Sequence, residues 1–147
     1  MVEPAADMLS ERARRVLDIA AEVARHFGVQ QTYGEHILIA LALVWDGLAA
    51  RTLLTFNLDD KVLYEDLRRL EENVYRPAPV RLNSSAERAL DPAMSEAKRL
   101  GSNQVDSEHL LLGVAAVEGL AADILAYHHV DAVMVRAEID RLLAAQQ

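Results

Sequence analysis

The stretch Tyr33-Gly34-Glu35-His36-Ile37-Leu38-Ile39 has a close copy in the second half of the chain. The copy, Asp106-Ser107-Glu108-His109-Leu110-Leu111-Leu112, follows about 73 residues later. Each copy is a short polar turn, a Glu-His pair and an apolar run, which is typical of a helix start. The acid in the first turn lies near the positive end of the helix dipole. Two copies at matching places in the two halves indicate an internal duplication.

The composition favours packed helices. The chain has 147 residues, enough for one well-filled core or two small fused cores. Hydrophobic residues make up 52% and aromatic residues only 5%, which suits helices better than sheets. The formal net charge of −8 argues against nucleic acid or an anionic membrane as the main partner. Because there is no cysteine, disulfides, thiolate zinc sites and cysteine nucleophiles are excluded.

The sequence carries no signal for export or membrane insertion. Residues 1–8 lack a basic region followed by a long apolar core. The apolar run at 38–45 is too short to span a bilayer. We therefore expect a soluble, cytoplasmic, monomeric helical protein.

Apolar residues at helical spacing predict four helices in the first half, at about 11–27, 35–44, 49–56 and 59–73. Ser10 can cap the first helix and Gly28 can end it. Pro77 and Pro79 mark a linker. The predicted organisation is one domain over residues 1–147, with repeat one at 9–73, the linker at 74–82 and repeat two at 83–145.

The second half repeats this plan. Asn83 or Ser84 can cap the start of a helix that ends at Gly101, and Asp131 has the same position as Asp59, as the cap of the last helix. Pro92 falls inside the first of these helices, where we expect a kink. The sequence therefore predicts an all-α fold of two four-helix units that pack face to face about a pseudo-twofold axis.

The repeated pattern resembles the Clp N-terminal repeat, the domain at the front of the Clp ATPases that unfold proteins for a protease. The matching segments cover nearly the whole chain and lie at 9–17, 34–38, 88–90, 96–101 and 107–113. The resemblance implies an eight-helix double Clp repeat that binds protein substrates or adaptors, with a Clp ATPase as a further partner. No P-loop is present to bind nucleotide phosphates, so the chain lacks the motor. We expect either a stand-alone repeat protein or an excised domain of a larger ATPase, and the stand-alone form is favoured.

The resemblance also implies a binding site. In some members, the Glu at the positions of Glu35 and Glu108 helps to bind phosphorylated arginine on substrates. A carboxylate can hold a guanidinium through paired hydrogen bonds, and a helix N-terminus can hold the phosphate. The hydroxyl cap of each repeat would add a donor, which indicates Ser10 and, in the second repeat, Asn83 and Ser84.

The family usually has Thr just before this Glu. Here the residues are Gly34 and Ser107, so the first site loses a hydroxyl and the second keeps one. The competing interpretation is that both acids only stabilise their helix starts, a contribution of about 0.3–1 kcal/mol each.

The histidines favour structural roles over catalysis. His36 and His109 lack a second His four residues later, as a zinc-binding helix would have. We expect them to bond the turn to the helix start. His128 and His129 are adjacent and point in different directions, so we expect surface positions rather than a chelating pair. The sequence predicts no cofactor, no metal and no catalytic residue.

Two further stretches have competing interpretations. Arg12, Arg14 and Arg15 fit a solvated face on which Glu11 pairs with Arg15, or a docking edge for an acidic partner. We expect Trp45 to pack in the core rather than to anchor a peptide.

The alternatives to a binding domain are a structural helical subunit and a small enzyme that uses Glu35 and His36.

Overall fold

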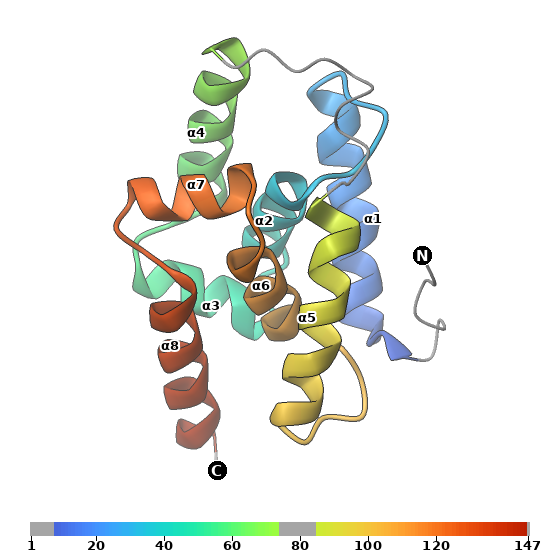
Figure 1. The fold of residues 1–147 in the computed structure, drawn as a ribbon, viewed down its shortest axis with the longest axis vertical. Coiled ribbons are helices and arrows are strands. Elements are labelled where there is room, and N and C mark those ends of the chain that lie inside the picture. Colours follow the sequence, from blue (N-terminus) through green and yellow to red (C-terminus); the bar gives the residue numbers. More distant parts are fainter. Residues whose placement is uncertain (1–7, 74–84, 147) are drawn as a thin grey trace.

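The computed structural model describes residues 8–73 and 85–146, and these form eight α-helices (Figure 1). The all-α, eight-helix prediction is confirmed. The helices are α1 (Glu11–His26), α2 (Gly34–Leu43), α3 (Leu48–Thr55), α4 (Asp60–Asn73), α5 (Ser85–Arg99), α6 (Ser107–Ala116), α7 (Leu120–Tyr127) and α8 (Ala132–Ala145).

The helices pack as two related sets of four. α1 packs on α2 as α5 packs on α6, and α2 packs on α4 as α6 packs on α8. Between the halves, α3 contacts α8 and α4 contacts α7, while α2 and α6 meet at the centre. Every helix contact in the described part of the chain has its counterpart when the halves are exchanged. This exchange is the pseudo-twofold relation that the sequence predicted.

The two central helices form the core. All residues from Gly34 to Ala42 are buried, and so are those from His109 to Val114. A helix that is apolar on all sides must be covered on all sides, and the surrounding helices supply that cover (Figure 1). The Glu-His pairs therefore stand where the core helices begin.

Helix ends follow the predicted turn chemistry. Gly28 and Gly101 both take a left-handed backbone, with φ of 75° and 74°, which only glycine adopts without cost. Asp59 Oδ1 accepts from the Val62 N–H at 2.9 Å, and Asp131 Oδ1 accepts from the Met134 N–H at 2.9 Å. The predicted caps of the last helix in each repeat are thus confirmed.

Other predictions meet different outcomes. Pro92 lies inside α5, and the kink expected there stays a prediction. The linker at 74–82 lies outside the described residues, so the repeat boundaries also stay predictions. The core position of Trp45 is wrong, because its side chain is 79% exposed. Val44, the C-cap of α2, fills the core instead, and Trp45 falls in the loop that follows.

No helix in the described residues is by itself long and apolar enough to cross a membrane. Two pairs, α2 with α3 and α6 with α7, meet the length and composition criteria only together, and each pair bends by 90° or more.

Candidate functional site

The first turn of α6 is held by a capping box. Asp106 is the N-cap, and its Oδ1 accepts from the Ser107 N–H at 2.7 Å. The Asp106 N–H in turn donates to Nδ1 of His109 at 2.8 Å. Because Nδ1 must be unprotonated to accept, this bond needs a neutral imidazole. Burial lowers the pKa of His109 below its ordinary value, although nearby Asp106 opposes the shift.

The start of α2 is built in the same way. The Tyr33 N–H donates to Nδ1 of His36 at 2.9 Å. The prediction that His36 and His109 bond the turn to the helix start is confirmed. His129 is exposed as expected, but His128 is only partly exposed and pairs with Asp66. The described residues contain no group of three or more His, Asp or Glu side chains that could hold a metal.

Glu108 lies in the first turn of α6, half-buried. Its Oε1 is shielded from solvent and accepts no hydrogen bond. Burial raises the pKa of Glu108 above its ordinary value, while the Arg12 guanidinium and the Ser107 hydroxyl act in the opposite direction. Oε1 therefore has no donor from the protein and is also out of reach of solvent, so a donor from outside could meet only the exposed part of this half-buried side chain.

Cations from α1 lie beside this turn. Arg12 Nη1 donates to Asp106 Oδ2 at 2.9 Å, and its Nε lies 3.4 Å from Asp46 Oδ2. Arg15 Nη2 contacts both carboxylate oxygens of Asp46 at 2.9 Å. The predicted pairing of Arg15 with Glu11 is wrong, because Asp46, in the α2–α3 loop, lies within reach of Arg15 and takes its place.

The loop from α2 to α3 packs against the first turn of α6. The Ala49 N–H donates to the buried Ser107 Oγ at 3.3 Å. A Cβ at Gly47 would lie 2.5 Å from Ser107 Oγ and 3.1 Å from Arg12 Cδ. Only glycine allows the loop to approach this closely, so the Ser107 hydroxyl is part of the packing between the repeats.

Ser10 joins this cluster from the first repeat. Its Oγ accepts from the Ala13 N–H at 2.9 Å, which confirms it as the cap of α1. Its own N–H donates to Val105 O at 2.9 Å, and the Val105 N–H donates to Met8 O at 2.7 Å. The cap of the first repeat therefore lies beside the turn that leads into Glu108 of the second repeat.

The other predicted site residues are placed differently. The side chain of Glu35 is fully buried at the start of α2. Asn83 and Ser84 lie outside the described residues. The structure thus brings together Ser10, Ser107 and Glu108 but not Glu35.

Sequence reasoning missed Asp106 and Asp46 as members of this cluster. The available signals were an acid just before the Ser107-Glu108-His109 helix start and an Asp-Gly pair after the second helix, but neither indicates a partner in the other half.

Comparisons with known proteins agree with the geometry. The family model described as "Clp repeat (R) N-terminal domain" matches residues 8–126 and 81–147. The ATP-dependent Clp protease ATP-binding subunit ClpC of Staphylococcus epidermidis is 31% identical over 141 residues, which cover 95% of this chain and 17% of that protein. ClpC of Staphylococcus aureus is 32% identical over 137 residues, covering 92% of this chain and 17% of that protein. The chain therefore spans about a sixth of the length of these relatives.

Solved structures match over nearly the full length. The N-terminal domain of the chaperone ClpD from Arabidopsis thaliana superposes with a TM-score of 0.79 at 15% identity, covering 98% of this chain and 99% of that one. The Hsp104 N-terminal domain from Candida albicans gives a TM-score of 0.70 at 15% identity, with 95% and 93% covered. At these identities the likeness establishes the fold alone.

Proposed function

Because this chain belongs to the family of Clp repeat N-terminal domains, we propose that it is a non-catalytic binding domain that receives protein substrates or adaptors for a Clp unfoldase-protease. The observation that carries the proposal is Glu108 in the first turn of a core helix, which is only partly buried, whereas its counterpart Glu35 is fully buried.

The ligand that we propose for Glu108 is phosphorylated arginine on a protein substrate. The carboxylate would accept from the ligand guanidinium, as paired Arg–carboxylate contacts do. The phosphate carries negative charge and would lie against Arg12 and Arg15, beside the positive end of the α6 dipole. Ser10, as the hydroxyl cap next to this turn, would add a donor.

We restrict the proposed site to the second repeat. Glu35 has no solvent-accessible surface, so a ligand could reach it only if the surrounding helices opened. Its role in the proposal is to stabilise the start of α2. The expected stoichiometry is one ligand per chain.

An enzyme that uses Glu35 and His36 is disfavoured by the same burial. Both side chains are inaccessible to solvent, and Nδ1 of His36 already accepts from the backbone. A catalytic acid or base must reach the proton that it transfers.

Calorimetric titration with free phospho-arginine, arginine and phosphoserine tests the proposed ligand. The unsubstituted chain is expected to bind phospho-arginine, and Glu108→Gln to weaken that binding at least about tenfold, since a charge-assisted pair contributes roughly 1.5–3 kcal/mol. Glu22→Gln, an exposed acid on α1, is the matched control and should bind as the unsubstituted chain does.

Equal binding of phosphoserine, or no effect of Glu108→Gln, would reject the site. A pull-down with an arginine-phosphorylated protein and with a Clp ATPase then tests the broader role. A chain that captures neither, and that is aggregated or unstable alone, would instead fit the structural-subunit alternative.

A further inference from the structure

One carboxylate in the loop between α2 and α3 lies against two arginines of α1. Both oxygens of Asp46 lie 2.9 Å from Arg15 Nη2. Asp46 Oδ2 also lies 3.4 Å from Arg12 Nε but accepts no hydrogen bond from it. The hydrogen bond from Arg15 is the main cause that holds the pKa of Asp46 below its ordinary value. Asp46 is therefore an anion at neutral pH, and Arg15 is the residue that chiefly holds it.

Arg12 and Arg15 are also the two cations against which the phosphate of the proposed ligand would lie. Arg12 Nη1 already donates to Asp106 Oδ2 at 2.9 Å. In the part of the chain that the structure describes, the one ion-pair partner of Arg15 is Asp46. Because both oxygens of Asp46 contact Nη2, a phosphate oxygen that accepts from this nitrogen would have to take the place of Asp46.

The charges around this turn oppose an anionic ligand as long as Asp46 stays in place. Arg12 and Arg15 face three acids, since Asp106 and Glu108 lie on the other side of Arg12. Arg12 compensates Asp106, and the ligand guanidinium would compensate an ionised Glu108. Asp46 is then the acid that neutralises Arg15. When Asp46 is displaced, Arg15 becomes free to attract a phosphate.

Asp46 can leave Arg15 without any movement of the helices. The side chains of Asp46 and Arg15 are 57% and 52% exposed, and an exposed ion pair contributes little net free energy. The rest of the loop is fixed independently, because Gly47 packs against Ser107 and the Ala49 N–H donates to Ser107 Oγ. Rotation of the Asp46 side chain towards solvent is therefore enough to uncover Arg15.

The second repeat forms the corresponding turn without such an ion pair. The offset of about 73 residues between the Glu-His pairs relates Arg15 to Arg88, and Glu118 precedes the glycine cap of α7 as Asp46 precedes that of α3. Arg88 and Glu118 are both exposed, and neither forms an ion pair within the described residues. The turn therefore does not need an Arg–acid pair in order to fold.

We propose that Asp46 is an internal competitor of the anionic ligand, because its carboxylate occupies the position on Arg15, beside Arg12, that the ligand phosphate takes on binding. The inference rests on the proposed function for the identity of the ligand and adds a residue that sets the affinity and selectivity of the site. A group with one negative charge gains little by replacing Asp46, whereas a phosphate carries about two negative charges and is favoured in the exchange.

Two anions test the inference on the full chain at constant ionic strength. Phospho-arginine is titrated by calorimetry, and inorganic phosphate by phosphorus NMR. D46N and D46S are each expected to bind both anions about three- to tenfold more tightly than the unsubstituted chain, since both the ion pair and one opposing charge are removed. E118Q is the matched control, because it removes the same charge at the corresponding, unpaired turn position, and its affinities should not change.

A double variant shows whether the gain acts through Arg15. D46N/R15Q should bind both anions no more tightly than R15Q alone, because the cation that Asp46 would have released is absent. Circular dichroism verifies that each variant is folded.

Equal affinities of D46N and the unsubstituted chain for both anions, an equal gain in E118Q, or a gain that persists in D46N/R15Q would overturn the inference. So would a failure of D46N to bind either anion. If the unsubstituted chain and D46N bind phospho-arginine equally tightly, the inference fails and the proposed function stands. If no variant binds phospho-arginine but D46N gains phosphate binding through Arg15, the proposed ligand is rejected and Asp46 remains the competitor.

Discussion

The proposed role of Glu108 sets two opposing requirements, since a carboxylate that binds a guanidinium must be ionised and burial favours its neutral form. Its folded pKa is raised, chiefly by burial, while the unfolded group titrates near about 4.3. The stabilising contribution of the neutral form is complete below the unfolded pKa and is lost as the pH rises through the folded pKa. A ligand cation would compensate for this loss in the bound state.

Glu108→Gln cannot ionise, so its stability relative to the unsubstituted chain should increase as the pH rises from 4 to 7. The difference in thermal midpoint between the variant and the unsubstituted chain is therefore expected to be more favourable to the variant at pH 7 than at pH 4. Urea unfolding at several pH values measures the difference. A pH-independent result for Glu108→Gln would contradict the burial argument.

His109 makes the same helix start sensitive to acid. Its folded pKa is lowered, chiefly by burial, so its contribution to stability is present above the ordinary value of about 6.5 and is lost as the pH falls through the folded value. His109→Leu removes the acceptor of the Asp106 N–H and should cost about 1–3 kcal/mol.

His109→Asn tests the capping role directly, because its side-chain oxygen can occupy the position of Nδ1 without titrating. Chemical denaturation between pH 5 and 8 measures the free energy of unfolding. At pH 8, His109→Asn should lower this free energy less than His109→Leu does. It should also show a flatter acid limb than the unsubstituted chain. A steep acid limb retained in His109→Asn would show that another group causes it.

At the scale of helices, close approach of α5 and α6 depends on Gly113. A Cβ at this position would lie 2.3 Å from the carbonyl oxygen of Ala89 and 3.2 Å from Cβ of Ala93. Backbone cannot yield as a flexible side chain can, so α5 would have to move away from α6. Gly113→Ala is therefore expected to lower the free energy of unfolding by about 1–3 kcal/mol, despite the better helix propensity of alanine.

Urea unfolding measures this effect, with Ala116→Ser, exposed at the end of the same helix, expected within about 0.5 kcal/mol of the unsubstituted chain. A neutral or stabilising Gly113→Ala would mean that the two helices can separate without loss of packing.

The helices themselves could be predicted from the sequence because their signals are local. Caps such as Ser10, Asp59 and Asp131 act within three residues, and the glycines Gly28 and Gly101 end helices through their own backbone. Trp45 was misplaced because an apolar residue next to an apolar helix fits either core or loop by pattern alone. In the structure, Val44 is the apolar residue that is buried in the core, and Trp45 lies exposed in the loop that follows.

At the scale of the whole molecule, the candidate site could be predicted only in part, since its members come from both halves. The motif indicated Glu108 and the cap Ser10, but it placed Ser10 with the acid of its own repeat. The pseudo-twofold axis instead sets Ser10 and Arg12 of the first repeat against Val105 and Asp106 of the second. These contacts depend on how the two repeats pack against each other, and the spacing of residues within one repeat does not predict them.

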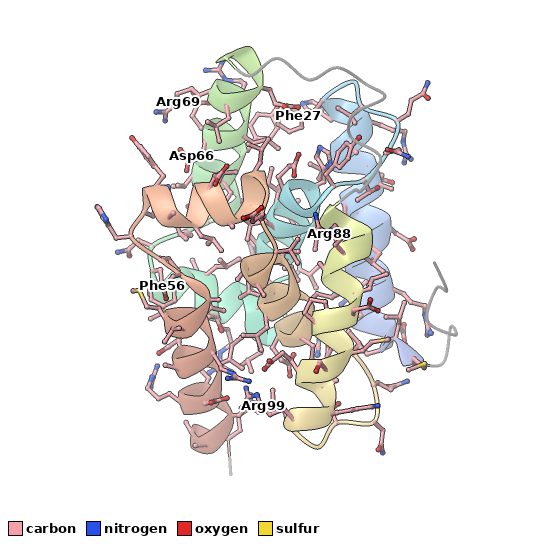
Figure 2. The ribbon with its side chains drawn as sticks, in the orientation of Figure 1. Phe27, Phe56, Asp66, Arg69, Arg88 and Arg99 are labelled. Carbon is pink, nitrogen blue, oxygen red and sulfur yellow. The ribbon has the colours of Figure 1, made fainter. Side chains whose placement is uncertain are left out.

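The same axis produces two matching contacts at the outer helices. On α4, Asp66 pairs with His128 and lies 3.7 Å from Arg69, and Figure 2 shows Asp66 on the part of α4 nearest α7. On α8, Glu138 accepts from Thr55 Oγ1 at 2.8 Å and from Arg141 at 2.7 Å. In each case an acid on the last helix of one repeat binds the end of the third helix of the other.

Glu138 should therefore stabilise the association of the halves in a pH-dependent way. Hydrogen bonds from Arg141, and then from Thr55, hold the pKa of Glu138 down to about 2. Because the folded pKa is lowered, the contribution is present above the unfolded value of about 4.3 and is lost as the pH falls towards 2. Glu138→Gln should lower the free energy of unfolding by about 0.2–1 kcal/mol at pH 7, and this difference should vanish towards pH 2 in urea titrations.

Thr55→Val separates the two causes, since it removes the contact between the repeats but leaves Arg141 in place. If Arg141 is the main cause, Thr55→Val should lower the stability at pH 7 while keeping most of the acid dependence. If Thr55→Val lost the acid dependence as completely as Glu138→Gln does, the contact across the pseudo-twofold axis, rather than the pair within α8, would be what keeps Glu138 ionised.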